Sequence, residues 1–239
     1  MKNLSRNLFL TAASAMMMIS SCETVKKTSN RDKGIVVGAA AGAVLGGVIG
    51  NNVGNKNNTA LGAILGAAIG GAAGGIIGNK MDKQAEKIKT ELPGAKVERV
   101  GEGIDVTFDE NNPDGTKAGV YFETNKYNIS NNSKLALDKL QKIFLEYPET
   151  NILIEGHTDD VGTDTYNLGL SQRRADAVGN YLKAAGISSA RLITRWYGES
   201  QPKVPNDSDA NRALNRRVQF VITANDKMKA EAKQEATKN

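Results

Sequence analysis

The sequence has 239 residues, 31 of them lysine or arginine and 26 aspartate or glutamate, with a formal net charge of +5 and 5% aromatic residues. Lys2 and Arg6 carry two of those charges, so a chain without its first 21 residues carries +3. A mild, unpatterned basic charge with few aromatic residues excludes nucleic acid as the expected partner. The single cysteine, Cys22, excludes an intrachain disulfide.

The first 21 residues have the pattern of a signal peptide. Lys2 and Arg6 give a positive start, and Leu8–Ile19 is an apolar run too short to span a bilayer. The tetrapeptide Ile19–Cys22 resembles the bacterial lipobox, which implies cleavage before Cys22 and acylation of its thiol and new amino group. Several acyl chains would hold the protein stably on outer-membrane lipid. An ordinary secretory signal with a chance cysteine is the alternative.

A polar tether over residues 22–33 precedes a segment in which glycine recurs at every fourth position. The glycines form two runs, at positions 38, 42, 46, 50 and 54, then at 62, 66, 70, 74 and 78. This spacing clears one stripe of a helix, so that a second backbone can approach closely. An isolated helix would lose about 1 kcal/mol for each interior glycine, so packing must offset the loss. We predict a glycine-zipper helical hairpin over 34–80, embedded in a membrane or self-associating, with a flexible spacer as the alternative.

The pattern changes after the second glycine run. Residues 81–95 are predicted to be a charged connector, helical over Met81–Glu91. Apolar and polar residues then alternate, and the sequence Asn111–Gly115 is a strong turn signal. We therefore predict a β-hairpin that pairs Gly103–Phe108 with Gly119–Phe122.

Helices and strands alternate through the rest of the chain. Apolar residues at helical spacing, a serine N-cap and a terminal Tyr-Pro pair define the first of these helices. The predicted elements are a helix over Ser130–Tyr147, a strand over Asn151–Glu155, a helix from near Ser171 to Leu182, a strand over Arg191–Tyr197, a short helix over Asp209–Asn215 and a strand over Val218–Thr223. This order predicts one α+β domain over 96–226, with helices packed on one side of a sheet. Residues 227–239 are charged and are predicted to be a disordered tail.

Several short motifs occur in order within this domain. They are Gly156–Asp159, Tyr166-Asn167, Leu170-Ser171, Arg174-Ala175 and Asn215–Val218. Together they resemble the signature of the OmpA-like peptidoglycan-binding domain, over roughly Gly119 to Thr223. The resemblance implies a β/α/β/α/β-β sandwich. The glycine-rich segment, in turn, is similar to the glycine-zipper region that precedes such domains in some outer-membrane lipoproteins.

The resemblance implies roles for two charged residues. Peptidoglycan cross-links built on diaminopimelate present an amine and a carboxylate on one small stem. Asp159 would accept hydrogen bonds from the ammonium, and the planar fork of Arg174 would match the carboxylate. Without the resemblance, Asp159 reads as a turn residue and Arg174 as a solvated charge in the first turn of a helix.

Further positions match the family residue by residue. The implied binding residues are Phe122, Thr124, Asn125, Thr158, Asn167 and Leu170, and Arg216 with Arg217 would brace the site loop. Many members carry an acid-rich stretch where this chain has Thr124-Asn125, so Glu123 is the candidate for the missing acid.

Catalysis is not expected, because the sequence offers no Cys–His pair and no metal-ligand cluster, and His157 reads as a strand-end residue. The acids near Asp159 lack the spacing of a calcium loop. No cofactor or metal is predicted. The expected function is that of an outer-membrane lipoprotein whose C-terminal domain lies in the periplasm and binds the diaminopimelate stem peptide. The alternative is a glycine-zipper membrane oligomer that the C-terminal domain moors to the wall.

Overall fold

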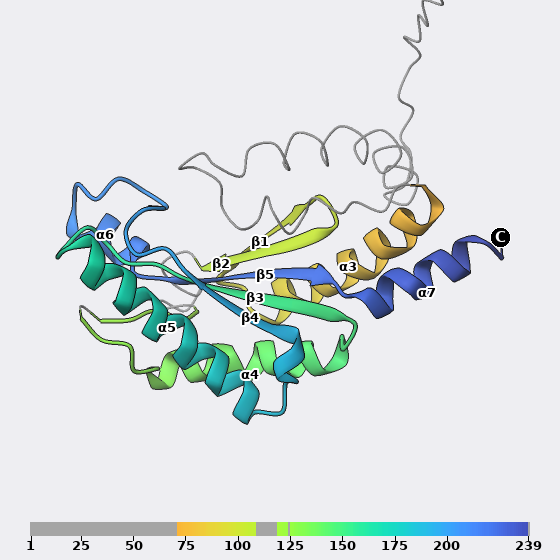
Figure 1. The fold of residues 1–239 in the computed structure, drawn as a ribbon, viewed down its shortest axis with the longest axis horizontal. Coiled ribbons are helices and arrows are strands. Elements are labelled where there is room, and N and C mark those ends of the chain that lie inside the picture. Colours follow the sequence, from red (N-terminus) through yellow and green to blue (C-terminus); the bar gives the residue numbers. More distant parts are fainter. Residues whose placement is uncertain (1–70, 109–118, 124, 239) are drawn as a thin grey trace, which may run out of the picture.

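The computed structural model describes residues 71–108, 119–123 and 125–238. The predicted signal peptide, the acylated Cys22, the tether, most of the 34–80 hairpin, the Asn111–Gly115 turn and Thr124 lie outside these residues. The described elements are α3 (Ala72–Glu91), β1 (Ala95–Val100), β2 (Gly103–Phe108), α4 (Asn131–Glu146), β3 (Thr150–Gly156), α5 (Asp164–Ala184), a short 3-10 helix (Ser189–Arg191), β4 (Leu192–Trp196), α6 (Asp209–Asn215), β5 (Val218–Ala224) and α7 (Asp226–Ala236) (Figure 1).

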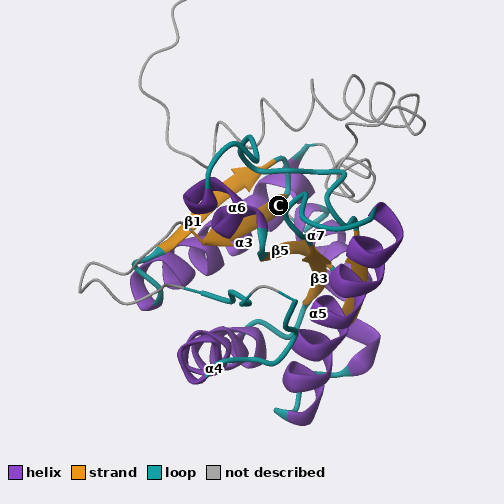
Figure 2. Ribbon diagram, turned by 90° about the vertical axis from the view of Figure 1, so that its left-hand side faces the viewer, coloured by secondary structure: helices purple, strands orange, loops and turns teal. Residues whose placement is uncertain are grey.

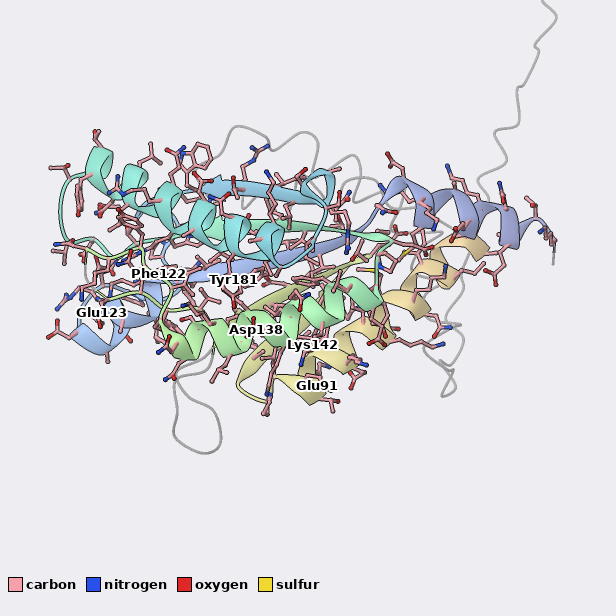
Figure 3. The ribbon with its side chains drawn as sticks, turned by 90° about the horizontal axis from the view of Figure 1, so that it is seen from below. Glu91, Phe122, Glu123, Asp138, Lys142 and Tyr181 are labelled. Carbon is pink, nitrogen blue, oxygen red and sulfur yellow. The ribbon has the colours of Figure 1, made fainter. Side chains whose placement is uncertain are left out.

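One five-stranded sheet organises the domain, with strand order β1-β2-β5-β3-β4. Its strand pairs are antiparallel except for β3 and β4, which run parallel. Helices α4 and α5 lie on the same side of the sheet, as Figures 2 and 3 both show. The core between sheet and helices is apolar and fully buried, with Ile154 and Phe220 from the strands and Leu140 from α4 at its centre. The predicted α+β sandwich is confirmed.

Helix α4 forms where its sequence predicts it. The Ser130 hydroxyl accepts a hydrogen bond from the Ser133 amide at 3.2 Å, which caps the first turn. Leu137, Leu140 and Phe144 follow at helical spacing and are fully buried.

The predicted hairpin is wrong in its pairing. Strand β2 pairs with β1, which precedes it, in register from Ala95 opposite Phe108 to Val100 opposite Gly103. Gly101 adopts a φ of 57°, the left-handed conformation that suits glycine in so tight a turn. The 119–123 segment contributes one isolated bridge, from Tyr121 to Arg217. The strong turn signal further along the chain led to the wrong partner.

The predicted boundary between zipper, connector and domain is also wrong. Helix α3 is continuous from Ala72 to Glu91, so it joins the last glycines of the repeat to the connector in one element. Ile77, Met81 and Ile88 are fully buried in the domain core. Their spacing of four and seven residues places them on one helical face, although charged residues surround them in the sequence. The domain therefore begins at α3 and not at residue 96.

The C-terminal tail is helical and packed, which contradicts the prediction of disorder. The Asn225 side chain accepts from the Met228 amide at 3.0 Å and caps α7. Met228 and Ala232 are buried, and α7 lies against α3. Figure 1 shows the two helices side by side at one end of the sheet.

Helix α5 begins seven residues earlier than predicted, at Asp164 in place of Ser171. The Thr163 hydroxyl accepts from the Tyr166 amide at 3.3 Å and serves as N-cap. Arg174 consequently lies in the middle of the helix and not in its first turn. Among the residues the structure describes, no helix combines the length and the apolar character needed to cross a bilayer.

Candidate binding site

The predicted site residues gather at one end of the sheet, where β3 leads into the loop before α5. Figure 3 shows Phe122 and Glu123 at this end, on the side where α6 lies. Gly156 makes the arrangement possible, because a Cβ added there would lie 2.1 Å from the carbonyl oxygen of Ser171 in α5. Only glycine lets the strand end so close to the helix, and Thr158 and Asp159 follow directly from that contact.

The Asp159 carboxylate is fixed from two sides. Its Oδ2 lies 2.7 Å from Nη1 of Arg216, and its Oδ1 accepts from the Val161 amide at 3.3 Å. The residue is 5% exposed, so the ion pair is shielded from water on most sides. A charge-assisted bond in such a setting holds the carboxylate in one orientation.

Arg174 is fully buried beside this loop, and its guanidinium is held by backbone carbonyls. Nε donates to Lys126 O at 3.0 Å, Nη1 to His157 O at 3.1 Å and Nη2 to Glu123 O at 3.1 Å. The guanidinium carbon also lies 5.1 Å from the centre of the Phe122 ring, a cation–π contact. The alternative interpretation of Arg174 as a solvated charge is therefore wrong: Arg174 ties Glu123 and Lys126 to the end of β3.

Burial lowers the pKa of Arg174 to about 10, and the nearby Asp159 charge acts in the opposite direction. The guanidinium thus remains charged at neutral pH. The site holds two guanidinium groups, from Arg174 and Arg216, close to the single Asp159 carboxylate. The two guanidinium groups would attract an incoming carboxylate, and the carboxylates of Asp159 and the nearby Glu199 would attract an incoming cation.

Four other predicted residues are buried around these charges, and one is exposed. Phe122, Thr158 and Leu170 are 5%, 1% and 3% exposed, respectively. Asn167 is fully buried, and its Nδ2 donates to Glu199 Oε2 at 2.5 Å and to Asp159 O at 3.3 Å. Asn125, by contrast, is exposed and has a φ of 59°, which is uncommon for a residue with a side chain.

The side chains of the two arginines that were predicted to brace the loop lie in different places. Arg216 makes the ion pair with Asp159, whereas the Arg217 side chain is 6% exposed and points into a different polar cluster. There Arg217 Nη2 donates to Gln201 O and to Gln219 Oε1, both at 3.4 Å. Arg216 is the C-cap residue of α6, whereas Arg217 bridges to Tyr121 just before β5, so the two side chains leave the chain in different surroundings.

Sequence reasoning missed the buried polar cluster that Arg217 joins. Glu155 is fully buried, and burial raises its pKa to about 7. Its Oε1 accepts from the Tyr197 hydroxyl at 3.3 Å, and the His157 ring stacks on Tyr197 with 5.4 Å between centroids. Burial also lowers the pKa of His157 well below its ordinary value. The available signal was that Glu155 and His157 are two residues apart at the end of β3. Both must therefore lie on the face of the sheet opposite Ile154, and so close to each other.

Within the described ranges, no group of histidine, cysteine, aspartate and glutamate side chains is arranged to hold a metal ion. The site is instead a set of fixed charges and amide groups at the end of a strand. Such a set recognises a small charged ligand by hydrogen bonds.

Comparisons with known proteins agree with this architecture. The OmpA family matches residues 121–216, and the YMGG-like Gly-zipper family matches residues 1–82. The chain is 41% identical over 105 residues to outer membrane porin F of Pseudomonas fluorescens, covering 44% of this chain and 32% of that one. It is 35% identical over 116 residues to the peptidoglycan-associated lipoprotein of Buchnera aphidicola, covering 46% of this chain and 67% of that one.

A solved structure shares the fold beyond the matched family segment. A MotB-like protein from Desulfovibrio vulgaris is 28% identical with a TM-score of 0.52, over 62% of this chain and 93% of that one. The chain spans about a third of the length of the porin that it matches. The similarity to the porin therefore concerns one domain of that protein.

Proposed function

The chain belongs to the OmpA family, and from that premise we propose that it binds peptidoglycan non-covalently and tethers the outer membrane to the cell wall. The observation that carries this proposal is the buried Asp159 carboxylate in the neighbourhood of Arg174 at the end of β3. Both residues are buried and held by hydrogen bonds, and the Asp159 charge raises the pKa of Arg174 against the effect of burial. The role is one of binding and not of catalysis.

The ligand we propose is the diaminopimelate residue of the stem peptide. Its ammonium group would lie beside Asp159, whose carboxylate is the anion of the site. Its carboxylate would meet the guanidinium groups of Arg174 and Arg216. A guanidinium has five N–H donors, and Arg174, which is fully buried, uses one on each of three carbonyls. The Arg216 side chain is 19% exposed and offers the more accessible contact for a ligand. Phe122, Thr124, Asn125, Thr158, Asn167 and Leu170 complete the proposed site.

The expected affinity for one stem peptide is modest. Each charge-assisted hydrogen bond contributes about 1.5–3 kcal/mol, and two or three of them minus ordering costs give roughly micromolar to millimolar dissociation constants. A wall polymer offers many copies of the peptide to a protein held beside it. Tethering therefore succeeds without tight binding at any one site.

Anchoring at the other end rests on the N-terminal segment. We propose that Cys22 is acylated and holds the chain on outer-membrane lipid, with the C-terminal domain in the periplasm. The match to the Gly-zipper family over 1–82 supports a further proposal, self-association through the glycine repeat.

The choice of diaminopimelate can be tested with its decarboxylated analogue. Lysine is diaminopimelate without one carboxylate, so the two amino acids differ only in the group that the arginines would bind. The full chain, kept in detergent, is incubated with purified sacculi and titrated with free meso-diaminopimelate or lysine. We expect meso-diaminopimelate to release the protein and lysine to fail. Equal competition by both, or by neither, would contradict the assignment.

A further inference from the structure

Two exposed tyrosines stand beside the proposed peptide site. Tyr127 is 45% exposed and Tyr166 is 42% exposed, although both are large apolar side chains. Tyr127 follows Lys126, whose carbonyl is bonded to Arg174, and Tyr166 precedes Asn167, whose amide is bonded to Asp159 O. Exposed aromatic side chains gathered at a binding site mark a surface that contacts a partner.

Both tyrosine rings are held by neighbours. The Arg173 guanidinium lies 5.5 Å from the centre of the Tyr127 ring. The Tyr166 ring lies against Gly162, where an added Cβ would be 3.4 Å from its Cδ1 atom. Rings fixed before binding lose little conformational entropy when a ligand arrives.

A half-buried glycine, Gly169, lies on the helix surface between Tyr166 and Arg173. Tyr166, Gly169 and Arg173 share one face of α5, because residues three and seven apart lie above one another on a helix. Tyr166 and Arg173 are thus separated by about 10 Å along the helix axis. A Cβ added at Gly169 would meet Arg173 Nη1 at 3.5 Å, an ordinary contact. Packing therefore does not require glycine here, although glycine weakens a helix interior.

We propose that this surface binds the glycan strand of peptidoglycan, with sugar rings seated over Gly169 between Tyr127 and Tyr166. The inference rests on the proposed function, since any stem peptide bound at Asp159 brings its sugar chain with it. A pyranose ring presents an apolar C–H face and a rim of hydroxyl groups. The tyrosine rings match the face, and the exposed Arg173 guanidinium supplies donors for the rim.

Charge at the edge of the surface favours a sugar chain over a membrane. The acidic Asp160 and Asp164 lie exposed in the adjoining loop and first helical turn, where they would repel anionic lipid headgroups. An uncharged glycan meets no such repulsion.

The test compares two ligands that differ only in the sugar. Purified disaccharide-peptide and the same peptide released from its sugar by an amidase are titrated into the full chain in detergent. We expect the disaccharide-peptide to bind at least about fivefold more tightly to the unaltered protein. Gly169→Leu should abolish this difference and leave the free-peptide affinity unchanged. Tyr166→Ala and Tyr127→Ala should each reduce the difference, whereas the corresponding changes to phenylalanine should keep it.

Gly169→Leu raises the helical propensity of α5, so a lost preference for the sugar would not come from unfolding. The matched control is Gly78→Leu in α3, where an added Cβ meets nothing within 4 Å. Equal affinity of the unaltered protein for both ligands would overturn the inference and leave peptide binding intact. Gly169→Leu would also overturn the inference if it weakened the binding of both ligands equally. The same holds if Gly169→Leu weakened binding to phosphatidylglycerol vesicles and left the binding of both muropeptides unchanged. Failure of the free peptide to bind the unaltered protein would refute the proposed function itself.

Discussion

Arg174 is a buried charged side chain that holds a loop of the proposed site in place. Its guanidinium donates to the carbonyls of Glu123, Lys126 and His157, which come from two different segments. The buried carbonyl of His157 needs a partner, and the same guanidinium that supplies it also holds the partly buried carbonyls of Glu123 and Lys126. The residue therefore positions the loop as well as contributing charge to the site.

Replacing Arg174 by alanine should destabilise the domain. The change leaves the buried carbonyl of His157 and the partly buried carbonyls of Glu123 and Lys126 without their donor, and an unsatisfied buried group costs about 1–3 kcal/mol. We expect a loss of at least about 1 kcal/mol in the free energy of unfolding, measured by urea denaturation. Arg174→Lys should recover only part of it, because an ammonium cannot span the same planar set of acceptors. An unchanged denaturation midpoint for Arg174→Ala would contradict this role.

Glu155 should make stability fall as the pH rises. Burial raises its pKa from 4.5 to about 7, so between these values the folded state holds a proton that the unfolded state has released. This stabilisation is fully present below pH 4.5, is lost as the pH passes 7, and amounts to about 3 kcal/mol. His157, whose pKa burial lowers, acts in the opposite direction below its ordinary value of 6.5.

A comparison with Glu155→Gln isolates the glutamate from the other titrating groups. Glutamine carries no charge at any pH, so the variant should gain stability relative to the unaltered protein between pH 5 and pH 8. Urea denaturation at both values measures the difference, and the gain should reach up to about 3 kcal/mol. A difference that does not depend on pH would show that Glu155 does not titrate in this range.

The sequence could predict which charged residues matter but not how they are held. Asp159 and Arg174 were identified by resemblance alone, because nothing in their spacing shows that they approach one another. The burial of Arg174 depends on Lys126, 48 residues away, and that contact exists only once the loop is folded. Arg216 and Arg217 looked equivalent, and only the folded structure separates the end of α6, where Arg216 lies, from the bridge to Tyr121 that Arg217 makes.

At the scale of elements, α3 and α7 extend the domain beyond the segment that matches the OmpA family. Helix α3 contributes Ile77, Met81 and Ile88 to the core, all fully buried. Full burial of a large apolar side chain contributes about 1.5–3 kcal/mol. Since whole domains are stable by only about 5–15 kcal/mol, the fold cannot spare this helix.

Two truncated chains test this boundary. A chain beginning at residue 71 keeps α3 and should unfold in one cooperative transition. A chain beginning at residue 96 loses α3 and part of β1, and should be unfolded or show no sharp thermal transition. Circular dichroism on heating distinguishes the two. A cooperative transition at the same temperature in both chains would place the domain boundary at residue 96 after all.

Elements with strong local signals were the predictable ones. Helix α4 has its cap, its apolar stripe and its proline stop within one stretch of sequence, and the structure agrees. Strand β1 and helices α3 and α7 have weaker signals, because charged residues cover their outer faces. Their apolar residues gain meaning only from the neighbours they pack against, which lie far away in the chain.

For the whole molecule, helix α3 determines how the glycine repeat is connected to the C-terminal domain. The helix starts within the glycine repeat and continues into the core without a break, so the repeat adjoins the domain directly. Helix α3 therefore joins the last glycines of the repeat directly to the domain that carries the proposed peptidoglycan site.

The Cys22 anchor has a direct chemical test. Cells that express the full chain are labelled with an alkyne fatty acid, and the protein is isolated and examined for label. The unaltered chain should be labelled and Cys22→Ser should not, because the lipobox resemblance assigns the thiol as the site of acylation. Label retained on Cys22→Ser would show that the lipid lies elsewhere.

The central claim is that Asp159 reads the ammonium group of diaminopimelate, and one binding measurement tests it most directly. The full chain and its Asp159→Ala variant are titrated with purified sacculi, with folding of each checked by thermal melting. Loss of the carboxylate should weaken binding at least about thirtyfold, the equivalent of about 2 kcal/mol. Asp160→Ala, which removes the exposed acid next to it, should bind as the unaltered protein does. Undiminished sacculus binding by a folded Asp159→Ala protein would contradict the claim.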